Sequence, residues 1–225
     1  AANDIDAIYI PLPNSMHREW VIKAAAAGKH ILCEKPLGLT AAECDEMALA
    51  AEQGGVLLME AFMYRFHPQT ELVQELVASG VIGELRMIKS AFTFHLTNPA
   101  NIRLSAELGG GALMDVGCYC VNISRTLAGS EPVEAQAYAT WADSGVDAQI
   151  AGTLRWANGL IAQFDAALTL ERREAYQAAG TDGYIDVPAA FVLNRETAHT
   201  ITVRHGRRSE ESHQTVAVDE YQLMA

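Results

Sequence analysis

The order of strands and helices changes once along this chain, near residue 63, and this change limits the possible folds more than any other feature. Short apolar runs at residues 5–10, 30–33 and 56–59 alternate with helical segments at 16–27 and 40–54. Strand, helix, strand, helix, strand at this spacing is typical of parallel strands joined by right-handed crossovers. We therefore predict an α/β unit with a parallel sheet over residues 1–63.

The rest of the chain, residues 64–225, has a different pattern. A helix is predicted at 68–80, a long strand at 85–96 and a second helix at 112–127. Further strands then follow without helices between them, at 133–141, 150–156, 160–168, 174–179, 184–187, 201–204 and 215–218. Asn158-Gly159 is a strong hairpin signal. These strands predict an α+β domain with a mostly antiparallel sheet.

The helix predicted at 112–127 has two distinct stripes. Its apolar residues recur at helical spacing and form the stripe that faces a core; they are Leu113, Val116, Cys120, Ile123 and Leu127. Asp115, Tyr119 and Asn122 lie on another face at positions i, i+4 and i+7. A polar stripe with a carboxylate and a phenol is suited to line a cleft between the two halves.

Composition excludes several kinds of partner. The formal net charge is −12, so a phosphate backbone or an anionic membrane surface would be repelled. No apolar run approaches the length of a membrane span. The four cysteines have no paired spacing typical of a zinc site or a disulfide framework, so we predict no metal and free thiols in the reducing cytoplasm. A small ligand fits this composition better.

Two loops follow the predicted parallel strands, at residues 11–17 and 34–37. Ligands bind beyond the carboxyl ends of the strands in an open parallel sheet. Lys35 follows its strand directly, and Pro36 restricts the backbone of Lys35 to extended conformations. An X-Pro bond at this point is also a candidate for the cis form. Its position thus separates Lys35 from an ordinary solvated loop residue.

Four motifs resemble one family when they are taken together and in order. They are Pro13-Asn14-Ser15-Met16-His17, Ala27-Gly28-Lys29-His30-Ile31-Leu32-Cys33-Glu34-Lys35-Pro36-Leu37, Glu60-Ala61-Phe62-Met63-Tyr64-Arg65-Phe66-His67-Pro68 and Gly109-Gly110-Gly111-Ala112-Leu113-Met114-Asp115-Val116-Gly117-Cys118-Tyr119. This series is similar to the glucose-fructose oxidoreductase, inositol dehydrogenase and rhizopine catabolism (Gfo/Idh/MocA) family. The resemblance implies a partial Rossmann domain followed by an open-faced, mostly antiparallel sheet domain.

The resemblance also implies a site. Pro13, Asn14 and His17 would touch an NAD or NADP cofactor, and Glu34 would shape the pocket near the nicotinamide ribose. Lys35 would lie between cofactor and substrate. Asp115 and Tyr119 would face Lys35 from the second domain. Many relatives have a histidine where Tyr119 stands, and the tyrosine resembles the branch of glucose-fructose oxidoreductase, pentose dehydrogenase and dimeric dihydrodiol dehydrogenase, which favours NADP.

The implied chemistry needs a base for the hydroxyl proton while a hydride moves to the nicotinamide. A free tyrosine has a pKa of about 10, and a neighbouring ammonium lowers the pKa of a phenol. Our hypothesis is that Tyr119 is the general acid/base, while Lys35 lowers the Tyr119 pKa and hydrogen-bonds the reacting oxygen. The two roles are exchangeable at this stage.

Simpler interpretations stand beside these. His17 suits a local cap contact as well as a cofactor contact, and Arg65 is interpreted as a structural ion-pair partner. The run Gly109-Gly110-Gly111 lacks the strand and the lysine-serine pair of a phosphate loop, so it is interpreted as a close-packing device. Tyr119 is also compatible with a core position, and Asp115 with a contact to the helix dipole.

Three function classes follow from the resemblance. The favoured class is an NAD(P)-dependent oxidoreductase acting on a sugar, a cyclic polyol or a dihydrodiol. The alternatives are an NAD-dependent glycoside hydrolase and a non-catalytic sensor. The sequence contains no Gly-x-Gly-x-x-Gly fingerprint. In the family this fingerprint lies upstream, so the resemblance implies a fragment that begins within the Rossmann domain and stops before the family's last segment. The open sheet predicts a homodimer or higher homo-oligomer.

Overall fold

The computed structural model describes residues 2, 4–193, 195–206 and 209–225. Its first part is a three-stranded parallel sheet in the order β1-β2-β3. The elements of this part are β1 (Ala7–Ile10), η1 (Asn14–Met16), α1 (His17–Ala26), β2 (His30–Glu34), α2 (Ala41–Gly54) and β3 (Leu58–Ala61). The parallel sheet with helical crossovers is confirmed.

Local capping explains where α2 begins and ends. The Thr40 hydroxyl accepts a hydrogen bond from the Glu43 amide at 3.2 Å, and the Glu43 carboxylate accepts one from the Leu39 amide at 2.8 Å. At the other end Gly55 has a φ of 63°, a left-handed conformation that favours glycine. The chain can then turn directly into β3.

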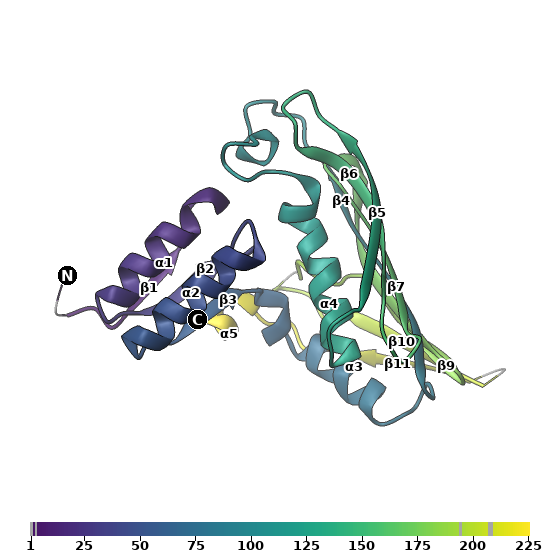
Figure 1. Cartoon of the computed structure of the whole chain (residues 1–225). Helices are drawn as coiled ribbons and strands as arrows, with labels where there is room; N and C mark the ends of the chain where they lie inside the picture. Colours follow the sequence, from purple (N-terminus) through teal and green to yellow (C-terminus); the bar gives the residue numbers. More distant parts are fainter. Residues whose placement is uncertain (1, 3, 194, 207–208) are drawn as a thin grey trace.

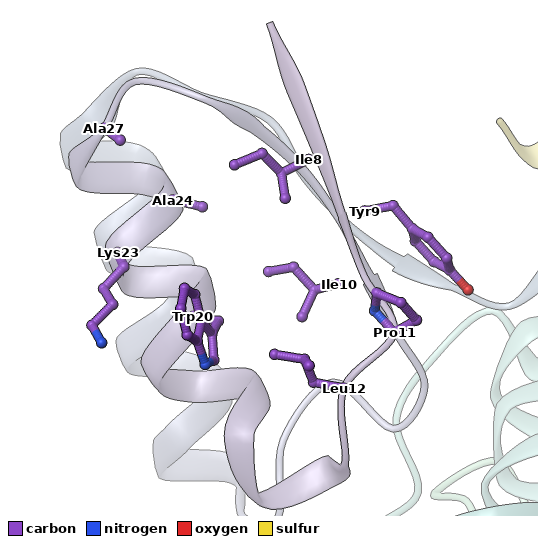
Figure 2. Close-up of a pocket in the computed structure, with 9 residues that line it drawn as sticks. All are labelled: Ile8, Tyr9, Ile10, Pro11, Leu12, Trp20, Lys23, Ala24 and Ala27. Atoms are coloured by element: carbon purple, nitrogen blue, oxygen red, sulfur yellow. The ribbon is translucent and has the colours of Figure 1, made fainter. Parts of the chain in front are cut away.

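Among the described residues, no strand pairs with the outer edge of β1, and an apolar groove lies beside this strand. Figure 2 shows Ile8, Ile10 and Leu12 facing Trp20 of α1 across this groove, while Tyr9 points to the opposite side of the strand. The groove has a volume of about 370 Å³. It holds few polar groups, so it does not resemble a site for a charged ligand.

The second part is an eight-stranded sheet in the order β11-β10-β9-β8-β4-β7-β6-β5. Its strands are β4 (Leu85–His95), β5 (Glu134–Trp141), β6 (Asp147–Arg155), β7 (Ile161–Ala167), β8 (Thr169–Gly180), β9 (Gly183–Val187), β10 (Thr200–His205) and β11 (Ser209–Gln214). Neighbouring strands are antiparallel except β4 and β7, which are parallel. The predicted mostly antiparallel sheet is confirmed.

Helices cover one face of this large sheet. They are η2 (Met63–Phe66), α3 (Pro68–Ala78), η3 (Ile102–Leu104), the π-helical turn η4 (Leu113–Gly117), α4 (Cys118–Ala128) and α5 (Glu220–Met224). Figure 1 shows α4 between the sheet and the N-terminal part, while no helix of the described residues lies on the other face of the sheet. The expected open-faced sheet is therefore present.

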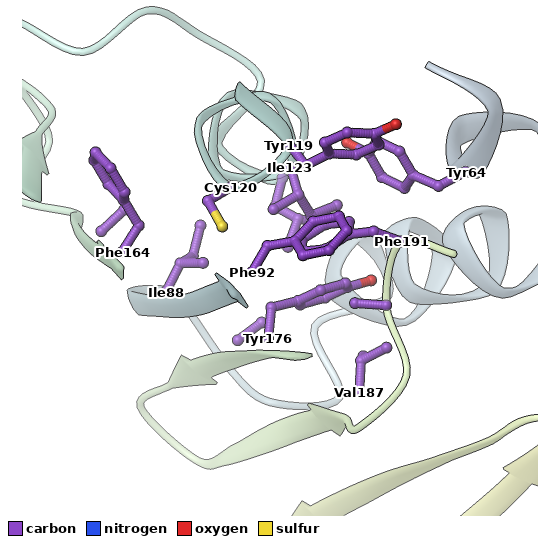
Figure 3. Close-up of a cluster of buried hydrophobic side chains, with 14 of the residues drawn as sticks. Tyr64, Ile88, Phe92, Tyr119, Cys120, Ile123, Phe164, Tyr176, Val187 and Phe191 are labelled. Carbon is purple, nitrogen blue, oxygen red and sulfur yellow. The ribbon is translucent and has the colours of Figure 1, made fainter. Parts of the chain in front are cut away.

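The core lies between α4 and the sheet. Four of the five residues in the predicted apolar stripe are buried, and Leu113 packs against them. Aromatic rings gather below the helix (Figure 3): Phe92 and Phe191 stack at 5.4 Å between ring centroids, and Tyr119 lies 5.5 Å from Phe191. Such aromatic pairs stabilise a core beyond the area that they bury. The core therefore fixes the ring of Tyr119.

One predicted strand is wrong. Residues 215–218 are not a strand, and the last strand, β11, comprises Ser209–Gln214. The alternating Val216 and Val218 suggested a strand, but Val216 is 62% exposed. The strand β11 has a polar sequence. It lies at the edge of the sheet, where its backbone pairs with β10 and its side chains do not have to pack against a core.

Candidate active site

Lys35 lies in a loop that is held from two sides. It follows β2 directly, and its peptide bond to Pro36 is cis. The Glu60 carboxylate accepts a hydrogen bond from the Leu37 amide at 2.8 Å, and the Pro36 carbonyl oxygen lies 2.9 Å from His17 Nδ1. Burial raises the pKa of Glu60, and the Leu37 amide partly offsets this effect. The backbone next to Lys35 is thus fixed by buried polar groups.

His17 connects two loops of the parallel sheet through its ring nitrogens. Its side chain is fully buried, and Nε2 lies 2.8 Å from the Leu12 carbonyl oxygen while Nδ1 contacts the Pro36 carbonyl oxygen. The ring therefore connects the loop after β1 to the loop after β2. Both ring nitrogens therefore have backbone partners in this structure, which gives His17 a structural role, and its contact with a cofactor stays a prediction.

Asp115 joins two cations. Lys35 Nζ lies 2.6 Å from the Asp115 carbonyl oxygen and 3.2 Å from Oδ1, and Arg103 Nε donates to Oδ2 at 2.6 Å. The side chains of Lys35 and Asp115 are only 13% and 12% exposed. Charge-assisted hydrogen bonds of this kind fix both partners. The structure thus brings the predicted pair together across the two domains and adds Arg103.

Tyr119 is near Lys35, although their polar atoms do not meet. The Lys35 ammonium lies 5.1 Å from the centroid of the Tyr119 ring, and the phenol donates to Met63 Sδ at 3.3 Å. Burial raises the pKa of Tyr119 well above its ordinary value, and nearby Cys118, Tyr221, Glu34 and Asp115 act in the same direction. The expected lowering of this pKa by Lys35 is therefore not found.

Two cavities share one wall. The larger cavity, of about 420 Å³, lies on the side of the eight-stranded sheet. It is lined by Met63, Phe92, Phe94, Val116, Tyr119, Arg172, Val192 and Tyr221. The smaller cavity, of about 170 Å³, lies on the side of the parallel sheet and is lined by Leu12, Asn14, Ile102, Leu108 and Gly110. Both are bordered by Glu34, Lys35, Arg103 and Asp115. These four charged residues therefore separate a narrow space from a wide one.

The remaining predicted residues lie around the small cavity or behind it. Glu34 accepts a hydrogen bond from the Tyr9 hydroxyl at 2.5 Å, and burial together with this contact raises the pKa of Tyr9. Asn14 Nδ2 donates to the Gly109 carbonyl oxygen at 2.8 Å. Pro13 lines neither cavity. Asn14 thus connects the first loop to the glycine run of the second domain.

Three site residues were missed by sequence reasoning. Arg103, Arg172 and Tyr221 border the larger cavity, and none belongs to a motif with a chemical signature. Tyr221 reaches the cavity from α5 at the far end of the chain. Only Arg103 has a local sequence signal, which is the capping residue Asn101 at the start of its short helix. The Asn101 side chain accepts a hydrogen bond from the Arg103 amide at 3.0 Å and so caps η3.

Other kinds of site were also sought. Among the residues that the structure describes, no three His, Cys, Asp or Glu side chains gather as metal ligands would. Within the same part of the chain, no helix is both long and apolar enough to cross a bilayer.

Comparison with protein families gives two matches in chain order. Residues 1–62 match a model of an oxidoreductase family described as an NAD-binding Rossmann fold, and residues 70–186 match the GFO/IDH/MocA C-terminal domain. Together they include β1 to β3 and most of the large sheet.

Named relatives agree with these models. A D-xylose 1-dehydrogenase (NADP(+)) of Haloferax volcanii is 41% identical over 90% of this chain, and a trans-1,2-dihydrobenzene-1,2-diol dehydrogenase of Oryctolagus cuniculus is 33% identical over 86%. The chain spans 62% and 60% of their respective lengths.

Solved structures show the same fold. A 3-ketoreductase from Actinomadura kijaniata, in complex with NADP and TDP-benzene, superposes with a TM-score of 0.92 at 29% identity. The match covers 99% of this chain and 69% of that one. Both family models, the relatives and the superposition show that this chain belongs to the Gfo/Idh/MocA family of oxidoreductases.

Proposed function

We propose that the whole protein is an NAD(P)-dependent oxidoreductase that transfers a hydride between the nicotinamide and a hydroxyl or carbonyl carbon of a sugar, a cyclic polyol or a dihydrodiol. One observation carries this proposal: Asp115 holds the Lys35 ammonium in the wall between the two cavities. Residues 1–63 would serve the cofactor, and residues 64–225 would serve the substrate. The names of the relatives support the same class of reaction.

The narrow cavity fits the nicotinamide end of the cofactor in size and in chemistry. Its volume of about 170 Å³ suits a small flat ring, and Asn14, Glu34 and Lys35 offer an amide, a carboxylate and an ammonium. These three residues would hold the cofactor, with Pro13 and His17 shaping the loops behind them. NADP is preferred, since the xylose dehydrogenase is named for NADP and the ketoreductase was solved with it.

The bound cofactor supplies or accepts the hydride. The side chains of this chain would control the proton and the charge on the substrate oxygen. Asp115 oxygens contact the Lys35 ammonium, which has three N–H donors, so one donor remains for the reacting oxygen. Because burial raises the Tyr119 pKa, its phenol stays protonated at neutral pH and holds a proton that carbonyl reduction requires. We therefore place Lys35 on the reacting oxygen and Tyr119 as the proton donor.

The larger cavity supports a sugar-like substrate. Its volume of about 420 Å³ lies in the usual range for small-molecule sites. Phe92 and Phe94 give it an apolar wall for the C–H faces of a ring, and Arg172 and Tyr221 give it polar groups for hydroxyls.

The test is a Lys35→Met variant of the full-length protein, assayed with NADP against a panel of aldoses and a trans-dihydrodiol. We expect kcat/KM to fall roughly 10²- to 10³-fold, the range for loss of a hydrogen-bond donor that stabilises charge on the reacting oxygen. Lys23→Met is the matched control, because Lys23 is exposed on α1 and pairs with Glu19.

Two results would contradict the proposal. One is turnover by Lys35→Met within a few-fold of the wild type. The other is a wild-type protein that forms no reduced nicotinamide with any substrate of the panel. Release of a glycoside without net reduction would support the hydrolase instead.

We further propose a homodimer in the cytoplasm. No helix of the described residues covers the open face of the eight-stranded sheet, and Tyr138 of β5, on that face, is 77% exposed. Large exposed side chains on an open sheet are typical of an interface. All four cysteines are free thiols, which fits a reducing compartment.

A further inference from the structure

Arg103 belongs to no predicted motif, yet its side chain reaches the centre of the site. It lies in the short helix η3, and its Nε donates to Asp115 Oδ2 at 2.6 Å. Its guanidinium carbon also lies 5.9 Å from the centroid of the Phe94 ring. The planar guanidinium is thus held between a carboxylate and an aromatic face, two partners that suit arginine better than lysine.

The backbone of Arg103 is fixed by the glycine run. The Arg103 carbonyl oxygen accepts a hydrogen bond from the Gly111 amide at 2.8 Å. A Cβ atom on Gly110 would lie 2.3 Å from that same oxygen, so only glycine permits this approach. A Cβ on Gly109 would lie 2.4 Å from Leu39 Cδ2. The run interpreted from sequence as a packing device therefore packs η3 against the start of η4, which carries Asp115.

Asp115 divides its carboxylate between two cations. Oδ2 accepts from Arg103 and Oδ1 from Lys35, and the side chain is only 12% exposed. Without Arg103, a nearly buried carboxylate oxygen would lose its charged donor, and the carboxylate could rotate away from Lys35. An unpaired buried acceptor lowers the stability of the folded state, and it does so by more when it is charged.

We propose that Arg103 is a positioning residue: it fixes the Asp115 carboxylate so that the Lys35 ammonium points at the reacting oxygen. This inference rests on the proposed function. Arg103 acts through Asp115, and the glycine run keeps it in reach.

The kinetic test compares Arg103→Gln with the wild type in the full-length protein. A misplacement of about 1 Å can reduce rate some 100-fold, so we expect kcat to fall about 10- to 100-fold while KM for the sugar changes less than about 3-fold. Guanidinium ion added to Arg103→Ala should restore part of kcat. Arg125→Gln is the control, because it removes a surface arginine paired with Glu131 and should keep wild-type kcat.

Thermal unfolding provides a readout that does not depend on turnover. Arg103→Gln and Asp115→Asn should each lower Tm, and the double variant should lower it no further than the worse single variant, because both remove the same interaction. Additive Tm losses would overturn the pairing. An unchanged kcat in Arg103→Gln, or no guanidinium rescue, would overturn the positioning role. A wild-type protein without turnover would reject the proposed function, and the thermal cycle alone would then decide whether the pair exists.

Discussion

At the scale of single residues, Tyr119 combines a core position with a place in the cavity wall. Its ring centroid lies 5.4 Å from that of Phe92, while its hydroxyl donates a hydrogen bond to Met63 Sδ. Removing the hydroxyl therefore removes little packing. We expect Tyr119→Phe to keep the wild-type Tm within about 2 °C and to lower kcat for carbonyl reduction roughly 100-fold or more. Tyr138→Phe, on the open sheet, serves as the control.

The raised pKa of Tyr119 gives this prediction a pH signature. A phenol whose pKa lies above its ordinary value stays protonated beyond pH 10. The reduction rate of the wild type should therefore show no loss from this group between about pH 7 and pH 9. A Tyr119→Phe variant with at least half of the wild-type kcat would assign the proton to another group.

Sequence reasoning identified those site residues that lie within a recognisable local pattern. Lys35 follows a strand and Asp115 lies on a patterned helix, and the structure brings them together across 80 positions. Arg103 and Tyr221 have no such local context. Their places in the site depend on loop packing and on a helix from the far end of the chain, which no short-range pattern encodes. For His17, residue type alone left a cofactor contact and a structural contact equally open.

At the scale of elements, the helix that carries Asp115 departs from the regular periodicity. The predicted helix at 112–127 begins with the π-helical turn η4 before α4. The spacing of apolar residues cannot reveal a π-helical turn. Such a turn inserts one residue but leaves the apolar stripe of the following α-helix unchanged. Asp147 holds its start by accepting from the Leu113 amide at 2.6 Å. π-turns occur frequently at functional sites, and this one contains Asp115.

The short helix α5 contains a buried acid. Glu220 is 2% exposed, its Oε1 accepts from the Leu193 amide at 3.2 Å, and burial raises its pKa from 4.5 to about 7. Because the folded state binds this proton more tightly than the unfolded state, stability should fall as pH rises from about 4.5 to 7, by about 3 kcal/mol at most. Glu220→Gln removes this loss.

Thermal melts at pH 5 and pH 8 test this prediction. We expect Glu220→Gln to exceed the wild type in Tm at pH 8 by several degrees and to match it more closely at pH 5. Glu75→Gln is the control, since Glu75 is exposed on α3. An equal gain at both pH values would show that the effect is not the ionisation of Glu220.

At the scale of the whole molecule, the two sheets were predictable and their arrangement was not. Strand order and helix spacing identify each sheet separately. Their relative placement depends on contacts such as Asn14 with the Gly109 carbonyl oxygen, which are 95 residues apart in sequence. The shared wall of the two cavities is a product of that placement. For this reason, the sequence indicated a site between two halves but gave neither of its cavities.

The open face of the large sheet permits a direct test of the proposed dimer. Tyr138, Ala151 and Asp165 form one cross-strand row on β5, β6 and β7. Ala151 is exposed, so Ala151→Arg should leave the monomer folded while placing a long charged side chain in this row, one strand in from the edge strand β5. We expect light scattering to show a dimer for the wild type and a monomer for this variant. Ala26→Arg adds the same charge on α1 and should stay dimeric. A wild-type monomer would reject the proposed dimer, and an Ala151→Arg dimer would place its interface on another surface.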